Sequence, residues 1–220
     1  MNTEIAGQQP RQRLIRFLAH SFSFIFHPLL IASYTMYFLI YVHPFAFTGF
    51  DSRTKLLRML NVIIVTFAFP AFSTFLAWRL KFVKSLYLTT QKDRIIPYAL
   101  SMFFYWWTWY VFRNLPETPP IAIRFLMGSF LAVCVGWFGN IFLKISMHAI
   151  AMGGLLGFAL LFSFSDNYSS GLYLSLAILI AGMVCSSRLI VSDHTYREIW
   201  LGLLLGGTAQ WLGWLFPVHS

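Results

Sequence analysis

The segment SSRLIVSDHTYREIW, from Ser186 to Trp200, holds two arginines, a histidine and two acids in a chain that is otherwise poor in charge. His194 and Glu198 are four residues apart, so on a helix they share a face and the carboxylate can accept a hydrogen bond from one ring nitrogen. The other nitrogen is then basic and can attack an electrophile such as phosphorus. Arg188 adds a fixed cation that suits phosphate oxygens.

A second group of polar residues lies in the segment LKISMHAIAMGG. His148 is a second imidazole, and it could give a proton to a departing alcohol oxygen while His194 attacks phosphorus. Ser146 stands where a helix is expected to begin, so its hydroxyl and the nearby amides would meet an anion at the positive end of the helix dipole. Gly153 and Gly154 would let another helix approach this turn closely.

The composition shows where these groups must lie. Hydrophobic residues make up 58% of the 220 positions, charged residues only 10%, and 24 residues are Phe. A soluble domain carries about a quarter charged residues, so this balance indicates a protein whose surface faces lipid. The net charge of +9 does not indicate a nucleic-acid partner, because the basic residues fall between hydrophobic blocks. Anionic lipid head groups or phosphates are the expected partners.

Apolar segments long enough to cross a bilayer recur along the chain, since roughly 20 residues in a helix span a hydrocarbon core about 30 Å thick. We expect an all-α, polytopic membrane protein in which residues 1–220 form one bundle of about six to seven transmembrane helices. Pro70 is expected to kink the second helix, and residues 1–20 to form a polar tail and a short interfacial helix. The expected helices run from about Ser21 to His43, Leu57 to Trp78, Pro97 to Phe112, Ile121 to Leu143, Met147 to Phe164, Leu172 to Val191 and Glu198 to Phe216.

The order of these helices brings the polar groups together. Two expected helices lie between Arg94 and His148, and two more lie between His148 and Arg188. Groups that are separated by helical hairpins open on the same face of a membrane. The segment QKDRIIPY, with Lys92 and Arg94, therefore joins the other two polar segments in one site, whose excess of donors suits a phosphate. The same count places the amino-terminal segment on the side of the site and the carboxyl end opposite.

These residues resemble the type 2 phosphatidic acid phosphatase superfamily, whose wider fold includes vanadium haloperoxidases. The resemblance covers roughly Lys92 to Gly206, about half the chain. The third motif of that family is Ser-Arg, five residues, His, three residues and Asp. Here Ser187, Arg188, His194 and Glu198 match that spacing, with Glu in place of Asp.

The other two family motifs are more divergent. The second is Pro-Ser-Gly-His, and the tetrapeptide ISMH keeps Ser146 and His148 at the right spacing. The first is Lys, six residues and Arg-Pro, whereas Tyr87 stands at the lysine position, Lys92 lies only two residues before Arg94, and the proline comes late, at Pro97.

The resemblance implies a role for each matched residue. His194 would be the nucleophile, Glu198 its orienting carboxylate and His148 the general acid. The phosphate would be held by Arg188, Arg94 and Ser146, with Lys92 as a further candidate. Members of the family need no metal and no organic cofactor, and most of the bacterial members work in the cytoplasmic membrane.

Other polar and aromatic residues have simpler interpretations. Lys144 and Arg197 lie near expected helix ends, from which their side chains can reach lipid head groups. Asp193 points to another side of the helix than His194, so we expect it to cap the last helix. The aromatic segment FFYWWTWY is expected to be lipid-facing or interfacial, and Cys134 and Cys185, which lie in apolar runs without metal-ligand spacing, to fill the core. The remaining histidines are expected to be packed or interfacial: His20, His27, His43 and His219.

Four functions remain open at this point. The first is an integral-membrane phosphatase that hydrolyses a lipid phosphomonoester or pyrophosphate through a phosphohistidine, on a phosphatidic acid, phosphatidylglycerophosphate or prenyl pyrophosphate. The second is a lipid phosphotransferase with the same site. The third is a transporter or binding protein that holds an anion without cleaving it. The fourth is a metal-dependent hydrolase with His148, His194 and Glu198 as ligands, which the nearby Arg94 and Arg188 disfavour.

Overall fold

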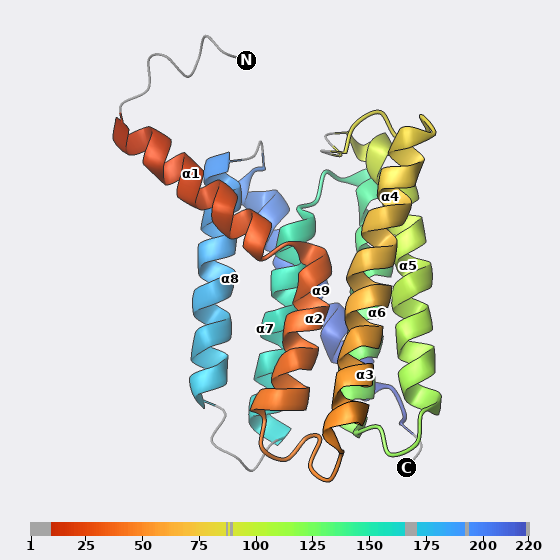
Figure 1. Ribbon diagram of the computed structural model, residues 1–220. Coiled ribbons are helices and arrows are strands. Elements are labelled where there is room, and N and C mark those ends of the chain that lie inside the picture. Colours follow the sequence, from red (N-terminus) through yellow and green to blue (C-terminus); the bar gives the residue numbers. More distant parts are fainter. Residues whose placement is uncertain (1–9, 87, 89, 166–170, 192–193, 219–220) are drawn as a thin grey trace.

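The computed structural model describes residues 10–86, 88, 90–165, 171–191 and 194–218. Every regular element in these residues is a helix, as expected for an all-α fold. Most helices stand roughly parallel in one bundle, and α1 crosses obliquely at one end (Figure 1). The elements are α1 (Pro10–Ile25), α2 (Pro28–Tyr37), η1 (Phe38–Val42), α3 (Ser52–Ile63), η2 (Ile64–Ala68), α4 (Phe69–Arg79), α5 (Gln91–Asn114), α6 (Pro120–Phe142), α7 (Met147–Ser165), α8 (Gly171–Val191) and α9 (Tyr196–Leu215), where η1 and η2 are π-helical turns.

The first expected helix, from Ser21 to His43, is wrong as a continuous element. The chain breaks between α1 and α2, whose axes differ in direction by 61°. Pro28 has no N–H and disfavours a helical conformation in the residue before it, so His27 is extended, with φ −61° and ψ 138°. His27 instead caps the new helix, because its side chain accepts a hydrogen bond from the backbone N–H of Leu29. We call residues 23–28 the elbow.

Two other helices contain a proline, and one of them, α5, also begins earlier than expected. α5 begins at Gln91, well before Pro97, because Thr90 caps it by accepting a hydrogen bond from the backbone N–H of Asp93. Pro97 lies inside this helix. In the segment from α3 to α4, the π-helical turn η2 lies immediately before Pro70, where the missing N–H leaves a carbonyl without its helical donor.

Several helices are long and apolar enough to cross a membrane. Four segments meet this description, namely Ser52–Arg79, α6, α7 and α8, and the bent pair of α1 and α2 makes a fifth if it counts as one span. These values hold for the described residues. The sequence predicted six to seven transmembrane helices, and that number is reached only if α5 and α9 also cross the membrane. The first turn of each of these two helices carries charged residues of the polar site.

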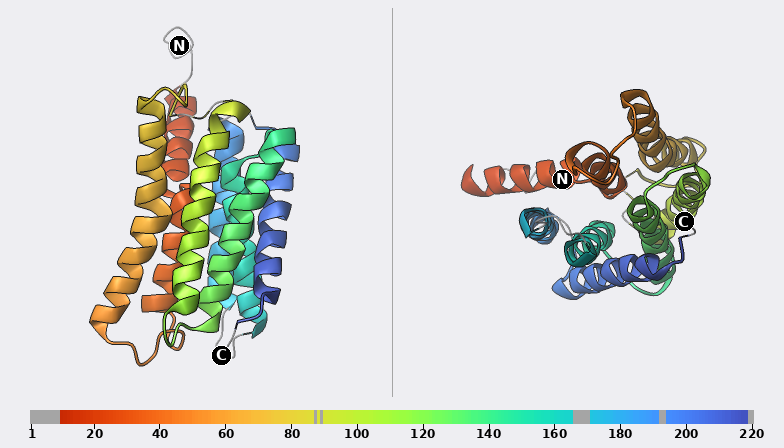
Figure 2. Two further views of the ribbon diagram at one scale, coloured as in Figure 1. Left: turned by 90° about the vertical axis from the view of Figure 1, so that its right-hand side faces the viewer. Right: turned by 90° about the horizontal axis from the view of Figure 1, so that it is seen from below.

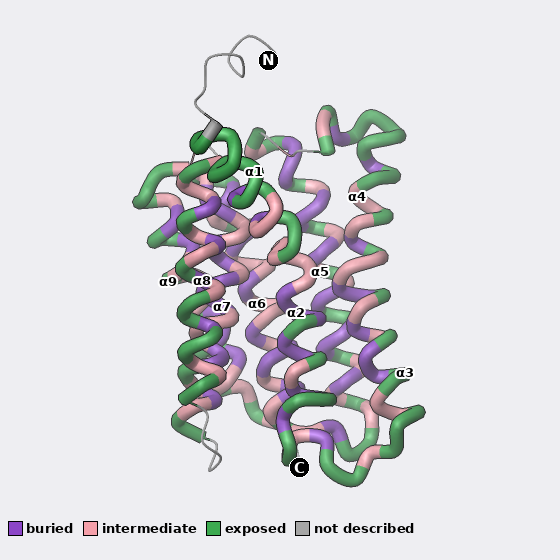
Figure 3. Tube along the Cα trace, turned by 60° about the vertical axis from the view of Figure 1, so that its left-hand side comes forward, coloured by how far each residue is buried: buried purple, intermediate pink, exposed green. Residues whose placement is uncertain are grey.

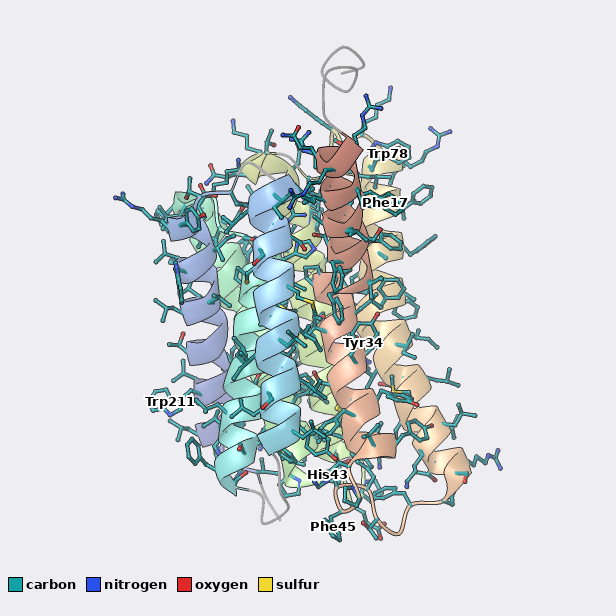
Figure 4. The ribbon with its side chains drawn as sticks, turned by 90° about the vertical axis from the view of Figure 1, so that its left-hand side faces the viewer. Phe17, Tyr34, His43, Phe45, Trp78 and Trp211 are labelled. Atoms are coloured by element: carbon teal, nitrogen blue, oxygen red, sulfur yellow. The ribbon has the colours of Figure 1, made fainter. Side chains whose placement is uncertain are left out.

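The outer surface of the bundle is apolar and rich in aromatic side chains. Buried residues face inward along each helix and exposed residues face outward (Figure 3). Phe17, Tyr34 and Trp211 project from the bundle at different heights (Figure 4) and are all exposed. In the segment FFYWWTWY the expectation of a lipid-facing surface holds for Phe103, Trp106, Trp107 and Tyr110, which are exposed, whereas Tyr105 and Trp109 are buried in the core.

The helices α7 and α9 make the most extensive helix contact, and glycine makes their close approach possible. A Cβ atom on Gly206 would lie 2.7 Å from the backbone nitrogen of Gly154, and one on Gly153 would lie 2.8 Å from Cα of Leu203. The expected close approach at Gly153 and Gly154 is therefore present. This contact fixes the start of α9 against the start of α7, where the polar residues lie.

The helix directions bring the three polar segments to one end of the bundle. α5 and α7 begin at this end, and α8 ends and α9 begins there (Figure 1). The left view of Figure 2 shows the helices standing side by side, and the right view, from below, shows α1 extending sideways from the bundle. α1 lies at the polar end and packs against α8, while α9 finishes at the opposite end. The arrangement that the sequence order predicted is therefore present.

Candidate functional site

His194 and Glu198 are joined by a short hydrogen bond. Nδ1 of His194 lies 2.7 Å from Oε2 of Glu198, and the His194 side chain is only 6% exposed. Because the carboxylate accepts, Nδ1 carries the proton and donates it, so a neutral His194 has its lone pair on Nε2. Glu in place of Asp does not prevent this contact, although His194 precedes the capping residue Thr195 and so lies just outside α9.

The carboxylate of Glu198 is also held by the start of α9. Thr195 caps the helix, and its hydroxyl accepts a hydrogen bond from the backbone N–H of Glu198 at 3.3 Å. Oε2 of Glu198 in turn accepts from the backbone N–H of Thr195 at 3.3 Å, which completes a capping box. The cap is therefore Thr195 and not Asp193, which lies outside the described residues.

The pKa of His194 is lowered from its ordinary value of 6.5. Burial is the largest cause, because it disfavours the charged imidazolium, and the positive charges of Arg94 and Arg188 act in the same direction. The hydrogen bond and negative charge of Glu198 oppose this effect. His194 is therefore neutral at neutral pH, which is the state that a nucleophilic imidazole requires.

Arg94 and Arg188 reach this imidazole from α5 and α8. Each interacts electrostatically with His194, and the two guanidinium groups interact with each other. Two like charges held close together repel, so an anion between them would be favoured. This part of the molecule can bind a phosphate next to an imidazole with a free lone pair.

Arg94 is also fixed by two backbone carbonyls. Its Nε donates to the carbonyl of Leu88 at 2.8 Å, and its Nη1 donates to that of Ile145 at 3.3 Å. Arg94 thereby ties the segment before α5 to the segment before α7. Lys92 is exposed and makes no hydrogen bond or ion pair with the part of the chain that the structure describes. Tyr87, at the position of the family lysine, lies outside that part.

His148 is held by a different kind of oxygen. Its Nε2 lies 3.1 Å from the backbone carbonyl of Ser23, so Nε2 carries a proton and donates it. His148 also interacts electrostatically with His194 and Arg188, which places it at the same site. Each imidazole therefore has one nitrogen bound to oxygen and the other left for chemistry. The partner is a carboxylate for His194 and a neutral carbonyl for His148.

Ser146 is fully buried and caps α7. Its hydroxyl accepts a hydrogen bond from the backbone N–H of Ala149 at 3.4 Å, and its carbonyl accepts one from Ile150 at 3.1 Å. These contacts satisfy amides of the first turn, which favours a structural role over the phosphate contact that the motif suggests. Lys144 is half-buried in the segment between α6 and α7, and Arg197 is exposed on the first turn of α9.

A chamber of about 260 Å³ has His148 in its wall. Its lining includes His27 and His148 at the site end of the bundle and reaches Gln210, near the far end of α9. Most of the remaining lining is apolar. A second, almost wholly apolar cavity of about 450 Å³ lies along α2, α7 and α8 and shares Ile31 and Leu155 with the chamber. Apolar space thus reaches His148 and His27.

His27 and Ser23 also belong to this site, although the sequence predicts a packed or interfacial residue at His27 and gives no indication of a role for Ser23. The rings of His27 and His148 are 5.9 Å apart between centroids and meet edge to face. The dipeptide His27-Pro28 could have indicated the helix start at this point, because a polar residue before proline often marks the beginning of a helix. Nothing in the sequence indicates that the carbonyl of Ser23 reaches a residue 125 positions away.

Among the residues that the structure describes, no group of three or more His, Cys, Asp or Glu side chains could hold a metal ion. Comparison with known proteins finds no matching family model, no matching curated protein and no matching solved structure. The phosphatase resemblance therefore depends on the residues and their geometry.

Proposed function

We propose that this protein is an integral-membrane lipid phosphatase that hydrolyses a phosphomonoester or pyrophosphate through a phosphohistidine on His194. The observation that carries the proposal is the 2.7 Å bond from Nδ1 of His194 to Glu198, which leaves Nε2 unprotonated beside Arg94 and Arg188. A base without these cations would not bind phosphate, and cations without the base would bind it without reaction.

The proposed reaction has two steps. The lone pair on Nε2 of His194 forms a bond to phosphorus, and the bond from phosphorus to the lipid oxygen breaks. The departing oxygen keeps the electron pair and takes the proton from Nδ1 of His148, which enters this step as the doubly protonated imidazolium because its Nε2–H remains bound to Ser23. Water then loses a proton to His148 and attacks phosphorus, which releases inorganic phosphate and restores His194.

The surroundings of the site support a lipid as the substrate. His148 lines a mostly apolar cavity of about 260 Å³, which shares two lining residues with a second apolar cavity of about 450 Å³, and such cavities suit hydrocarbon chains. We place all of α2 to α9 in the membrane, in about six to seven crossings that include α5 and α9, and assign the protein to a bacterial cytoplasmic membrane as the resemblance implies. Phosphatidic acid, phosphatidylglycerophosphate and prenyl pyrophosphates are the proposed substrate types.

Phosphate release tests this proposal. Purified protein in detergent is incubated with phosphatidic acid, phosphatidylglycerophosphate and a prenyl pyrophosphate, with a metal chelator present. We expect the wild-type protein to release phosphate from at least one lipid, and His194→Ala to release none. The matched control is His20→Ala, because His20 is exposed on α1 and has no proposed role.

The other outcomes separate the alternatives. Product that forms only when an alcohol acceptor is added would indicate a phosphotransferase. Phosphate binding without release from any lipid would indicate a protein that holds anions. Release that the chelator abolishes would indicate a metal-dependent hydrolase and would contradict the proposal.

A further inference from the structure

The elbow between α1 and α2 contributes a hydrogen-bond donor whose position is fixed. Nδ1 of His27 accepts a hydrogen bond from the backbone N–H of Leu29 at 3.3 Å. A ring nitrogen that accepts carries no proton, so the proton of the neutral imidazole must be on Nε2. The cap of α2 therefore selects the tautomer of His27.

Nε2–H of His27 makes no hydrogen bond to any residue that the structure describes. His27 lines the chamber beside His148, with the two ring centroids 5.9 Å apart. An N–H group that faces a mostly apolar chamber has few hydrogen-bond acceptors near it. Such a donor favours a ligand that accepts a hydrogen bond.

Arg188 links His27 to the phosphate site. Its guanidinium interacts electrostatically with His27, His148 and His194. A phosphate next to Arg188 would therefore lie within electrostatic range of all three imidazoles. His194 offers it a lone pair, whereas the neutral His27 can offer only an N–H.

We propose that Nε2–H of His27 donates a hydrogen bond to an oxygen of the bound phosphate, so that the elbow completes the anion site. The inference rests on the proposed phosphate site and adds a ligand that the family motifs do not contain. It also gives α1 a role, because the same elbow supplies the Ser23 carbonyl that orients His148. A donor of this kind contributes more as negative charge grows on the phosphate oxygens in the transition state.

Two substitutions separate this role from the structural role of His27. His27→Asn keeps an acceptor near the position of Nδ1, and Asn is among the best helix caps, but its side chain ends short of Nε2. His27→Gln places an amide N–H near the position of Nε2 but provides no acceptor at the position of Nδ1. The first variant keeps the cap without the donor, and the second keeps the donor without the cap.

The experiment measures three quantities on the full-length protein in detergent. These are the melting temperature, the Kd for inorganic phosphate and kcat/KM for the best lipid phosphate. For His27→Asn we expect an unchanged melting temperature, a Kd raised on the order of 10-fold, and kcat/KM lowered on the order of 10- to 100-fold. For His27→Gln we expect a lower melting temperature with Kd and kcat/KM closer to those of the wild type.

Wild-type phosphate affinity and kcat/KM in His27→Asn would overturn the inference and leave His27 as a helix cap. Equal losses of phosphate affinity in both variants would also overturn it, because they would show that the donor is not the important group. A wild-type protein that binds phosphate but hydrolyses no lipid would contradict the proposed phosphatase alone, and the Kd of His27→Asn would still decide the role of His27.

Discussion

At the scale of single residues, two imidazoles differ in the oxygen that holds them. Glu198 gives His194 a negative partner, and Ser23 gives His148 a neutral one. A carboxylate stabilises the positive charge that His194 gains when it attacks, while a carbonyl orients His148 without adding charge. This difference supports the assignment of His194 as the nucleophile, while His148 acts as the acid only in its imidazolium form, with a second proton on Nδ1.

The substitution Glu198→Gln tests the carboxylate. The amide can still accept hydrogen bonds from Thr195 and His194, so the capping box and the fold should be kept. The charge that stabilises the imidazolium is lost, and we expect kcat to fall on the order of 10²-fold or more, with little change in melting temperature. Phosphate release and thermal unfolding of the purified variant check this. A variant with wild-type kcat would show that His194 needs no charged partner.

The pH dependence of the rate tests the protonation state of His194. The nucleophile must be neutral, and its pKa lies below 6.5 because burial and the two arginines outweigh Glu198. At pH 6.5 and above His194 is mostly neutral, so we expect its protonation not to limit kcat/KM there. As the pH drops through the lowered pKa, His194 becomes protonated and kcat/KM should fall. Since Glu198 raises this pKa, Glu198→Gln should move the acid limb to lower pH. An acid limb above pH 6.5, or one that moves to higher pH in the variant, would contradict this.

At the scale of helices, the spacing of residues predicted some features and missed others. The four-residue interval from His194 to Glu198 predicted their hydrogen bond, but the expected reason, one turn of α-helix, is wrong, because His194 precedes α9 and the Glu198 side chain reaches back past the cap. The break at His27 and the early start of α5 were not predicted, because an apolar run conceals a helix end that depends on a single proline or a single capping threonine. The role of Ser23 could not be predicted, because its contact depends on how α1 packs.

The contact between α7 and α9 positions His148 against His194, and Gly206 permits it. For Gly206→Ala the added Cβ would meet the backbone of α7, which cannot move aside cheaply. We expect a destabilisation of about 1–3 kcal/mol, together with a loss of activity. The control is Gly182→Ala on α8, where an added Cβ meets no atom within 4 Å. Thermal unfolding in detergent compares the two, and equal stability of both variants would mean that the helices are less close than described.

At the scale of the whole molecule, the alternating helix directions explain how a chain with few charged residues gathers them into one site, while the rest of its surface stays apolar. The three polar segments lie far apart in the sequence but meet at one end of the bundle (Figure 1), because each pair is separated by a helical hairpin. That parity could be predicted without knowledge of any contact. The number of membrane crossings could not, because α5 and α9 combine polar first turns with apolar interiors.

The two ends of the bundle should face opposite sides of the membrane. Lys92 is exposed at the site end, and Arg53 is exposed on the first turn of α3 at the other end. In a background without Cys134 and Cys185, we expect Lys92→Cys and Arg53→Cys to react with a membrane-impermeant maleimide from opposite sides of sealed vesicles. Labelling of both from the same side would contradict the membrane arrangement.

The central claim is that His194 carries the phosphoryl group during the reaction, and trapping that intermediate tests it most directly. Purified protein is mixed with its best lipid phosphate, quenched in alkali within the first turnover, digested, and analysed by mass spectrometry, with His194→Ala and His148→Ala alongside. We predict a phosphorylated, acid-labile peptide containing His194 in the wild type and none in His194→Ala. His148→Ala should retain the modification if the first step still proceeds. Phosphate release by the wild type without any phosphorylated His194, or with phosphate on a different residue, would contradict the account.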